Sequence, residues 1–104
     1  MQSNDIRIDE RYVSFENINC FENACCVVDN MLRVLENPEH MNLYWKKIIP
    51  MIPKAYYERD PSLDESEALL YLICSNVFYI EELFDNADDE AGIASLRKCE
   101  LECC

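Results

Sequence analysis

The chain has 104 residues, of which 50% are hydrophobic, and a formal net charge of −12. A nucleic-acid-binding protein needs a basic surface, and an anionic membrane would repel this chain, so the charge argues against both partners. The apolar content is typical of a folded protein, and the length predicts one domain over residues 1–104. No apolar run approaches the roughly 20 residues that cross a bilayer, and no signal peptide is evident. We therefore expect a cytoplasmic protein.

The scarcity of glycine predicts an all-α fold, because strand-rich folds need many turn residues and Gly92 is the single glycine. We expect a loose or extended segment over 1–18, followed by a small helical bundle of three main helices plus a short aromatic-rich helix. Asn19 can cap the first main helix, and Glu22 can complete a capping box. The apolar stripe of this helix is predicted to comprise Phe21, Ala24, Cys25, Val28, Leu32 and Leu35.

The next segments predict the other three helices. Asn42 can cap the short helix LYWKKII, which Pro50 and Pro53 end or kink. A central helix is predicted from Asp64 or Ser66 to about Asp85, because ALLYLIC is apolar nearly all round. The last helix is predicted to carry acids in its first turn, where they suit the helix dipole: Asp88, Asp89 and Glu90. Its predicted inward residues are Ala91, Ala94, Leu96 and Leu101.

The seven cysteines are an odd number, and the neighbours Cys25–Cys26 and Cys103–Cys104 cannot pair with each other without strain. Since the cytosol keeps thiols reduced, we expect most to be free. Cys25 and Cys74 read as packing residues. Cys99 and Cys103 would share a helix face and could begin a metal site, but Cys20, Cys25 or His40 would have to complete it. No C-x-x-C pair is present, so we expect no bound metal.

Signals for catalysis are weak. The chain lacks the C-x-x-C-H motif of haem attachment and the glycine-rich loops that cradle phosphates, and nothing positions its only histidine, His40, beside a nucleophile. We therefore expect no enzymatic activity and no cofactor.

The acidic C-terminal quarter is a better lead. Residues 81–104 contain eight acids and two bases, which is half of the net charge. These acids are either a solvated face or an electrostatic docking surface. The predicted partner-binding residues are Glu81, Glu82, Asp85, Asp88 and Asp89.

Three stretches, RYVSFENINC, NLYWKKIIP and LLYLICSNVFYIEELFDNADDEAGIASLRKCELECC, resemble the CowN family. These small bacterial proteins sustain dinitrogen fixation when carbon monoxide is present. The resemblance covers residues 11–104. It implies a protein that associates with the molybdenum–iron protein of nitrogenase and protects the enzyme from carbon monoxide inhibition.

Two mechanisms are compatible with this resemblance. A scavenger would bind carbon monoxide through a metal such as haem iron, and the sequence has no recognisable haem site. A protector would bind nitrogenase and alter gas access, and we favour it. The alternative from another class is a small cysteine-based metal-binding or carrier protein that serves nitrogenase cofactor assembly.

Overall fold

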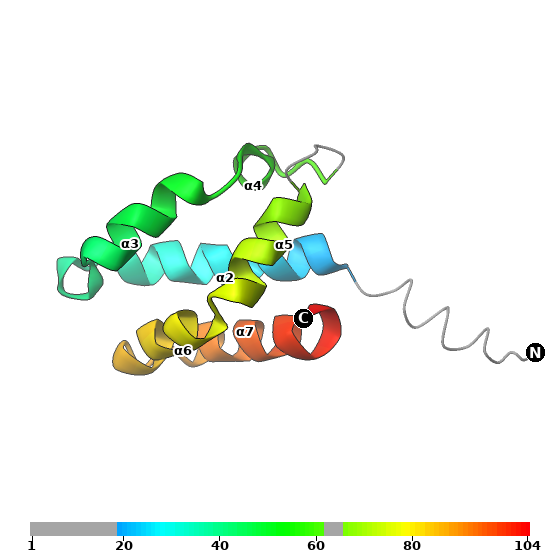
Figure 1. The fold of residues 1–104 in the computed structure, drawn as a ribbon. Coiled ribbons are helices and arrows are strands. Elements are labelled where there is room, and N and C mark those ends of the chain that lie inside the picture. Colours follow the sequence, from blue (N-terminus) through cyan, green and yellow to red (C-terminus); the bar gives the residue numbers. More distant parts are fainter. Residues whose placement is uncertain (1–18, 62–65) are drawn as a thin grey trace, which may run out of the picture.

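The computed structural model describes residues 19–61 and 66–104, and every regular element in these two ranges is a helix (Figure 1). The all-α prediction is confirmed, although these ranges contain six α-helices and two short 3₁₀ turns instead of the four predicted helices. The extended segment expected over 1–18 lies outside the described residues. The elements are α2 (Cys20–Leu35), η1 (Pro38–His40), α3 (Leu43–Ile48), η2 (Ile49–Met51), α4 (Lys54–Glu58), α5 (Ser66–Ser75), α6 (Val77–Asn86) and α7 (Glu90–Cys103).

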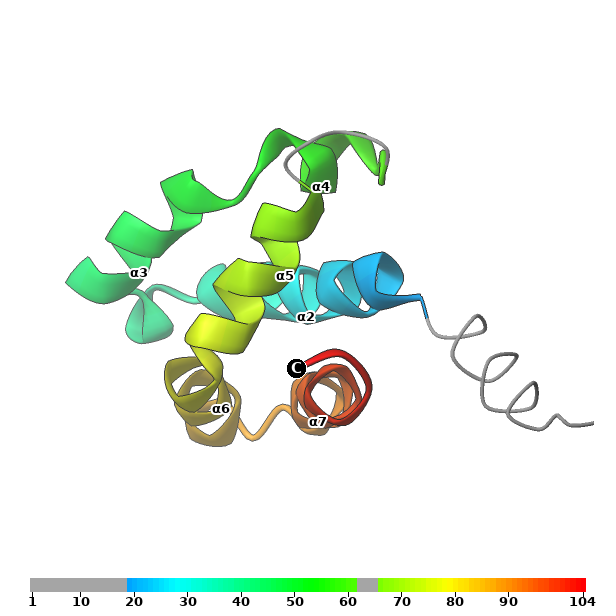
Figure 2. The same ribbon diagram turned by 45° about the vertical axis from the view of Figure 1, so that its right-hand side comes forward.

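Helix α2 begins as its sequence predicts, because the backbone N–H of Glu22 donates to Asn19 Oδ1 at 3.0 Å. Its buried face is wider than the predicted stripe and includes Val27, Met31 and Val34, whereas Phe21 and Leu32 are only partly buried. Figures 1 and 2 show that α5 crosses α2. They also show that α7 lies beside α2 and runs in the opposite direction to it. The central helix is therefore α2, and not the predicted helix from Asp64 or Ser66.

The predicted helix ending near Asp85 is also two helices, because the chain turns at Asn76 between α5 and α6. The Asn76 side-chain amide donates to the Leu72 carbonyl oxygen at 2.8 Å, and the Ser75 hydroxyl donates to the same oxygen at 3.4 Å. Such side chains compete with the helical backbone hydrogen bonds. The phenol of Tyr44, on α3, donates to Asn76 Oδ1, and this contact stabilises the turn between α5 and α6.

The predicted aromatic helix is present as α3. Its N-cap is Asn42, whose Oδ1 accepts the backbone N–H of Trp45 at 3.0 Å. Trp45 and Ile48 are buried under α3. After the turn that contains Pro50, the chain forms α4, a helix of five residues that the sequence did not predict.

The turn between α6 and α7 places the acids differently from the prediction. The backbone N–H of Asp89 donates to the Phe84 carbonyl at 2.9 Å, and that of Asp88 donates to the Asp85 carbonyl at 3.1 Å. This is the Schellman pattern, with Asp88 at φ 53° in the left-handed position that glycine usually takes. Asp89 is the N-cap of α7, so Glu90 is the one acid of this turn inside the first helical turn.

The inward face of α7 is likewise rotated from the prediction. Gly92, Leu96 and Cys99 are buried, whereas Ala91, Ala94 and Leu101 are exposed. The register follows from packing, because Gly92 lies against the ring of Phe84 on α6. Close approach of α6 and α7 at this glycine turns the side of α7 with Gly92, Leu96 and Cys99 toward the core.

Candidate partner-binding surface

Helix α6 carries three of the five predicted partner-binding acids. Glu82 and Asp85 are exposed and Glu81 is half-buried, and we call these three residues the acidic face of α6. Asp88 follows in the exposed part of the next turn. The Glu81 carboxylate lies 3.6 Å from the Arg97 guanidinium, but solvent reaches both side chains, which are 43% and 66% exposed, so this ion pair contributes little stability.

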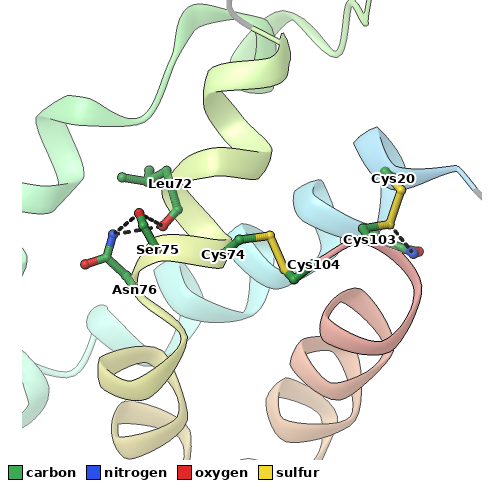
Figure 3. Close-up of a disulfide and its surroundings, with 8 residues drawn as sticks. Cys20, Leu72, Cys74, Ser75, Asn76, Cys103 and Cys104 are labelled. Atoms are coloured by element: carbon green, nitrogen blue, oxygen red, sulfur yellow. Dashed lines mark hydrogen bonds between the residues drawn. A yellow bond between two sulfur atoms is a disulfide. The ribbon is translucent and has the colours of Figure 1, made fainter.

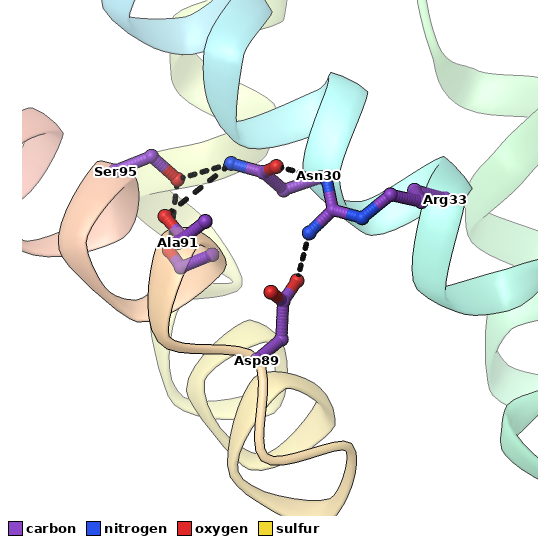
Figure 4. A network of polar contacts seen from close by, with 6 residues as sticks. Asn30, Arg33, Asp89, Ala91 and Ser95 are labelled. Carbon is purple, nitrogen blue, oxygen red and sulfur yellow. Dashed lines mark hydrogen bonds and ion pairs between the residues drawn. The ribbon is translucent and has the colours of Figure 1, made fainter.

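The Asp89 side chain is largely withdrawn from the surface. Its carboxylate pairs with Arg33 of α2, and its side chain is only 16% exposed. Figure 4 shows the contacts that continue from this pair: Arg33 donates to Asn30, and the Asn30 amide donates to Ser95 Oγ at 3.0 Å. The network joins α2 to the start of α7. Asp89 is therefore engaged in the fold, and no local pattern predicts its distant partner, Arg33.

Exposed aromatic side chains accompany the acidic face. The Phe78 side chain is 74% exposed, and with the acids it lines a surface hollow of about 270 Å³. Phe78 is not among the partner-binding residues predicted from the sequence. An exposed aromatic ring among charges is characteristic of binding surfaces, where the ring supplies apolar contact and the charges form a rim. The lining residues of the hollow are Phe78, Glu81, Glu82, Asp85 and Asn86.

A second hollow lies between α3 and α6. It has a volume of about 290 Å³ and is lined by aromatic rings and polar groups: His40, Asn42, Tyr44, Trp45, Tyr79, Glu82, Leu83 and Asn86. The Tyr44 ring contacts Tyr79, with 4.6 Å between the ring centroids, and Trp45, with 4.9 Å. Burial raises the pKa of Tyr44, so this phenol stays a neutral hydrogen-bond donor. Glu82 and Asn86 line both hollows.

The expectation that most thiols are free is wrong. Four of the seven are paired, as Cys20–Cys103 and Cys74–Cys104. The reason lies in the fold, because the end of α7 meets the start of α2 and the end of α5 (Figure 3). The neighbours Cys103 and Cys104 do not pair with each other, as predicted, because each forms a disulfide with a cysteine of a different helix. Cys74, interpreted from sequence as a packing residue, is instead half of a cross-link.

The remaining thiols are Cys25, Cys26 and Cys99. Burial raises the pKa of Cys25, and it raises that of Cys99 to about 11, so both groups remain protonated near neutral pH. A protonated, buried thiol is a poor nucleophile and a poor metal ligand. Within residues 19–61 and 66–104, no group of three or more His, Cys, Asp or Glu side chains is arranged to hold a metal ion.

One other cluster of titratable groups connects α2 to α4. Tyr56 donates to Asp29 Oδ1 at 2.5 Å, and Arg59 contacts the same oxygen at 2.6 Å while lying 4.8 Å above the Tyr56 ring centroid. Burial and the hydrogen bond to Asp29 both raise the pKa of Tyr56. Each group in the cluster has a partner within it. This arrangement accounts for the cluster as a structural link between the two helices.

The model of the family described as "N2-fixation sustaining protein CowN" matches residues 3–104 of this sequence. The chain belongs to the CowN family. A CowN protein of Arcobacter nitrofigilis is 66% identical over 104 residues, which cover 100% of both chains. One of Denitrovibrio acetiphilus is 57% identical over 100 residues, covering 96% of this chain and 94% of its own. One of Wolinella succinogenes is 55% identical over 96 residues, covering 91% and 81%.

These relatives are named N(2)-fixation sustaining proteins, which agrees with the resemblance seen in the sequence. No solved structure matches this CowN-family chain. None of the helices within the described residues is both long and apolar enough to cross a membrane.

Proposed function

We propose that this protein sustains dinitrogen fixation in the presence of carbon monoxide by binding the molybdenum–iron protein of nitrogenase and protecting the enzyme from inhibition. The observation that carries the proposal is membership of the CowN family over residues 3–104. The protein acts without catalysis of its own, as a protector that changes how the inhibitor reaches or affects the enzyme.

The acidic face of α6 is the proposed contact with nitrogenase. Glu81, Glu82 and Asp85 repel one another in the free protein, and a basic partner surface would relieve that repulsion. Phe78 stands beside them and offers apolar area to the same partner. Asp88 extends the acidic surface into the turn, while Asp89 supports the surface through its pair with Arg33.

The first experiment measures nitrogenase turnover under carbon monoxide with and without this protein. We expect substrate reduction to recover as the protein is added, and to recover less at higher salt, because screening weakens contacts between exposed charges. Unchanged inhibition at every protein concentration would refute the proposed function.

The second experiment replaces Glu81, Glu82 and Asp85 with Gln, Gln and Asn. The triple variant keeps side-chain size and removes three charges from α6, so it should fold normally but protect nitrogenase only at higher concentration. The matched control is Glu22→Gln, Glu67→Gln and Glu100→Gln, which removes three exposed charges from the start of α2, the start of α5 and the end of α7. Figure 1 shows these three helix ends grouped on the side remote from the end of α6. Equal protection by the triple variant and the wild type would show that the acidic face is only a solvated surface and not a contact with nitrogenase.

The metal-carrier alternative has less support. It needs several thiolates at one place, and Cys20, Cys74, Cys103 and Cys104 are held in two disulfides. Metal analysis of protein prepared anaerobically under reducing conditions separates the two functions, because the carrier predicts stoichiometric bound metal.

A further inference from the structure

The hollow between α3 and α6 has a chemistry of its own within the proposed docking surface. We propose that it is a socket for one arginine side chain of the partner protein. This inference rests on the proposed function and identifies the contact that fixes the position of the partner. The socket is defined by the lining residues Tyr44, Trp45, Tyr79, Glu82 and Asn86, together with His40, Asn42 and Leu83.

Its size matches a single side chain. The volume of about 290 Å³ lies at the lower limit of the roughly 300–1,000 Å³ that pockets for drug-sized ligands occupy. One long side chain projecting from a flat protein surface would be received between two helices, with its backbone left on the partner.

The walls of the socket suit a planar cation. Tyr44, Trp45 and Tyr79 supply three aromatic rings, and the contacts of Tyr44 with the other two rings hold them as one cluster. The Tyr44 phenol is further fixed by its hydrogen bond to Asn76. A guanidinium group stacks on aromatic faces and is more weakly hydrated than an ammonium group, so these walls favour arginine over lysine.

The rim of the socket supplies acceptors for the five N–H groups of a guanidinium. Glu82 contributes a carboxylate that pairs with no cation among the described residues, and Asn86 contributes an amide oxygen. His40 adds a ring nitrogen that accepts a hydrogen bond when the imidazole is neutral. Asn42 Oδ1 already accepts the N–H of Trp45, so it serves the helix cap.

Charge complementarity points to an occupant from another protein. The chain carries −12 in total, and the three arginines in the described residues are already paired, Arg33 with Asp89, Arg59 with Asp29 and Arg97 with Glu81. None of these three lines the socket. A partner surface with a projecting arginine would meet aromatic walls, one carboxylate at the rim and the rest of the acidic face around it.

The socket can be tested without nitrogenase, because Trp45 is the only tryptophan of the chain and lines it. Methylguanidinium chloride is titrated into the full-length protein while the Trp45 fluorescence is recorded, with methylammonium and sodium chlorides as references at equal ionic strength. We expect a saturable change with methylguanidinium that is weaker with methylammonium. Glu82→Gln should weaken the binding about tenfold, since it removes a hydrogen bond to a charged group, whereas Glu100→Gln should not change it. A linear response, or equal responses to all three salts, would overturn the proposal.

A second test of the socket measures how well single-residue variants protect nitrogenase from carbon monoxide. Tyr79→Phe retains the aromatic wall and should protect like the wild type, whereas Tyr79→Leu and Glu82→Gln should each require several-fold more protein for half-maximal protection. Glu100→Gln removes the same charge as Glu82→Gln, but from an exposed position near the C-terminal end of α7. Circular dichroism establishes that each variant is folded. If Glu82→Gln and Glu100→Gln lose protection equally, the effect is one of net charge and the socket is excluded. If the wild type fails to protect while methylguanidinium still binds, the proposed function fails and the socket stands.

Discussion

At the scale of single residues, Gly92 shows how a small side chain can set the position of two helices. A Cβ atom built at this position would lie 2.4 Å from Phe84 Cδ1 and 2.5 Å from Cε1. Phe84 is fully buried, so its ring has little room to move away. The glycine is therefore required by close packing between α6 and α7, and its φ is not in the left-handed region. It lies within α7.

We expect Gly92→Ala to destabilise the fold by about 1–2 kcal/mol. Overpacking a core typically costs about 1–3 kcal/mol of stability, and the higher helix propensity of alanine offsets up to about 1 kcal/mol of that cost. Urea unfolding followed by circular dichroism measures the change in the free energy of unfolding. In a Phe84→Leu background the penalty should shrink, because the smaller side chain leaves room for the methyl group. A stabilising Gly92→Ala would mean that propensity, and not the Phe84 contact, governs this position.

At the scale of elements, α7 is fastened along its whole length to α2. Arg33 and Asp89 join the two helices at one end, Asn30 and Ser95 join them near the middle, and the Cys20–Cys103 disulfide closes the other end. The Asn23 amide adds a hydrogen bond of 2.8 Å to Glu102 beside that disulfide. The second disulfide ties the chain end to α5. These links hold a helix whose buried face is narrow and poor in large apolar side chains.

Reduction of the two disulfides should therefore lower the thermal midpoint. Each cross-link restricts the unfolded chain, and the loss of a native disulfide from a small domain typically costs about 2–5 kcal/mol. A loss of that size shifts the midpoint by roughly 10 °C or more. The measurement is thermal unfolding with and without a phosphine reductant.

Thiol counting and a matched variant control this prediction. Denatured, unreduced protein should show three reactive thiols, rising to seven after reduction. Cys26→Ser removes an exposed thiol outside both disulfides and should leave the midpoint unchanged. Seven reactive thiols before reduction would show that the cross-links are absent under the conditions of preparation.

At the scale of the whole molecule, the net charge of −12 opposes compaction, and the four ion pairs found among the described residues have mostly exposed side chains. Attraction within these pairs offsets only a part of the repulsion among the other acids. The same excess charge would draw a basic partner toward the acidic face of α6. Stability and docking should therefore respond to salt in opposite directions.

We expect the thermal midpoint of the isolated protein to rise when sodium chloride is increased from about 0.01 M to about 0.2 M. Over this range the screening length falls from about 30 Å to below 10 Å, which removes long-range repulsion but little of the attraction in close pairs. Choline chloride should act similarly, because the effect needs no specific cation. A midpoint that falls with both salts would show that ion pairs such as Arg33–Asp89 dominate the electrostatic free energy.

The sequence by itself determined those features that depend on neighbours along the chain. Asn19 and Asn42 cap the amides of residues three positions later, so both helix starts follow from local chemistry. The all-α class follows in the same way from helical spacing and the scarcity of glycine. The family resemblance is also a property of the linear sequence, and the family model matches it.

The tertiary structure alone decided what depends on residues far apart in the chain. The turn at Asn76 is secured by Tyr44, which lies 32 positions away, and the Cys20–Cys103 cross-link joins residues 83 positions apart. Spacing rules for one helix carry no information on such contacts, which is why the break was missed and the thiols were expected to be free. The socket between α3 and α6 has the same origin. Its aromatic wall and its carboxylate come from two helices, and only the packed fold brings Tyr44 and Glu82 to one hollow.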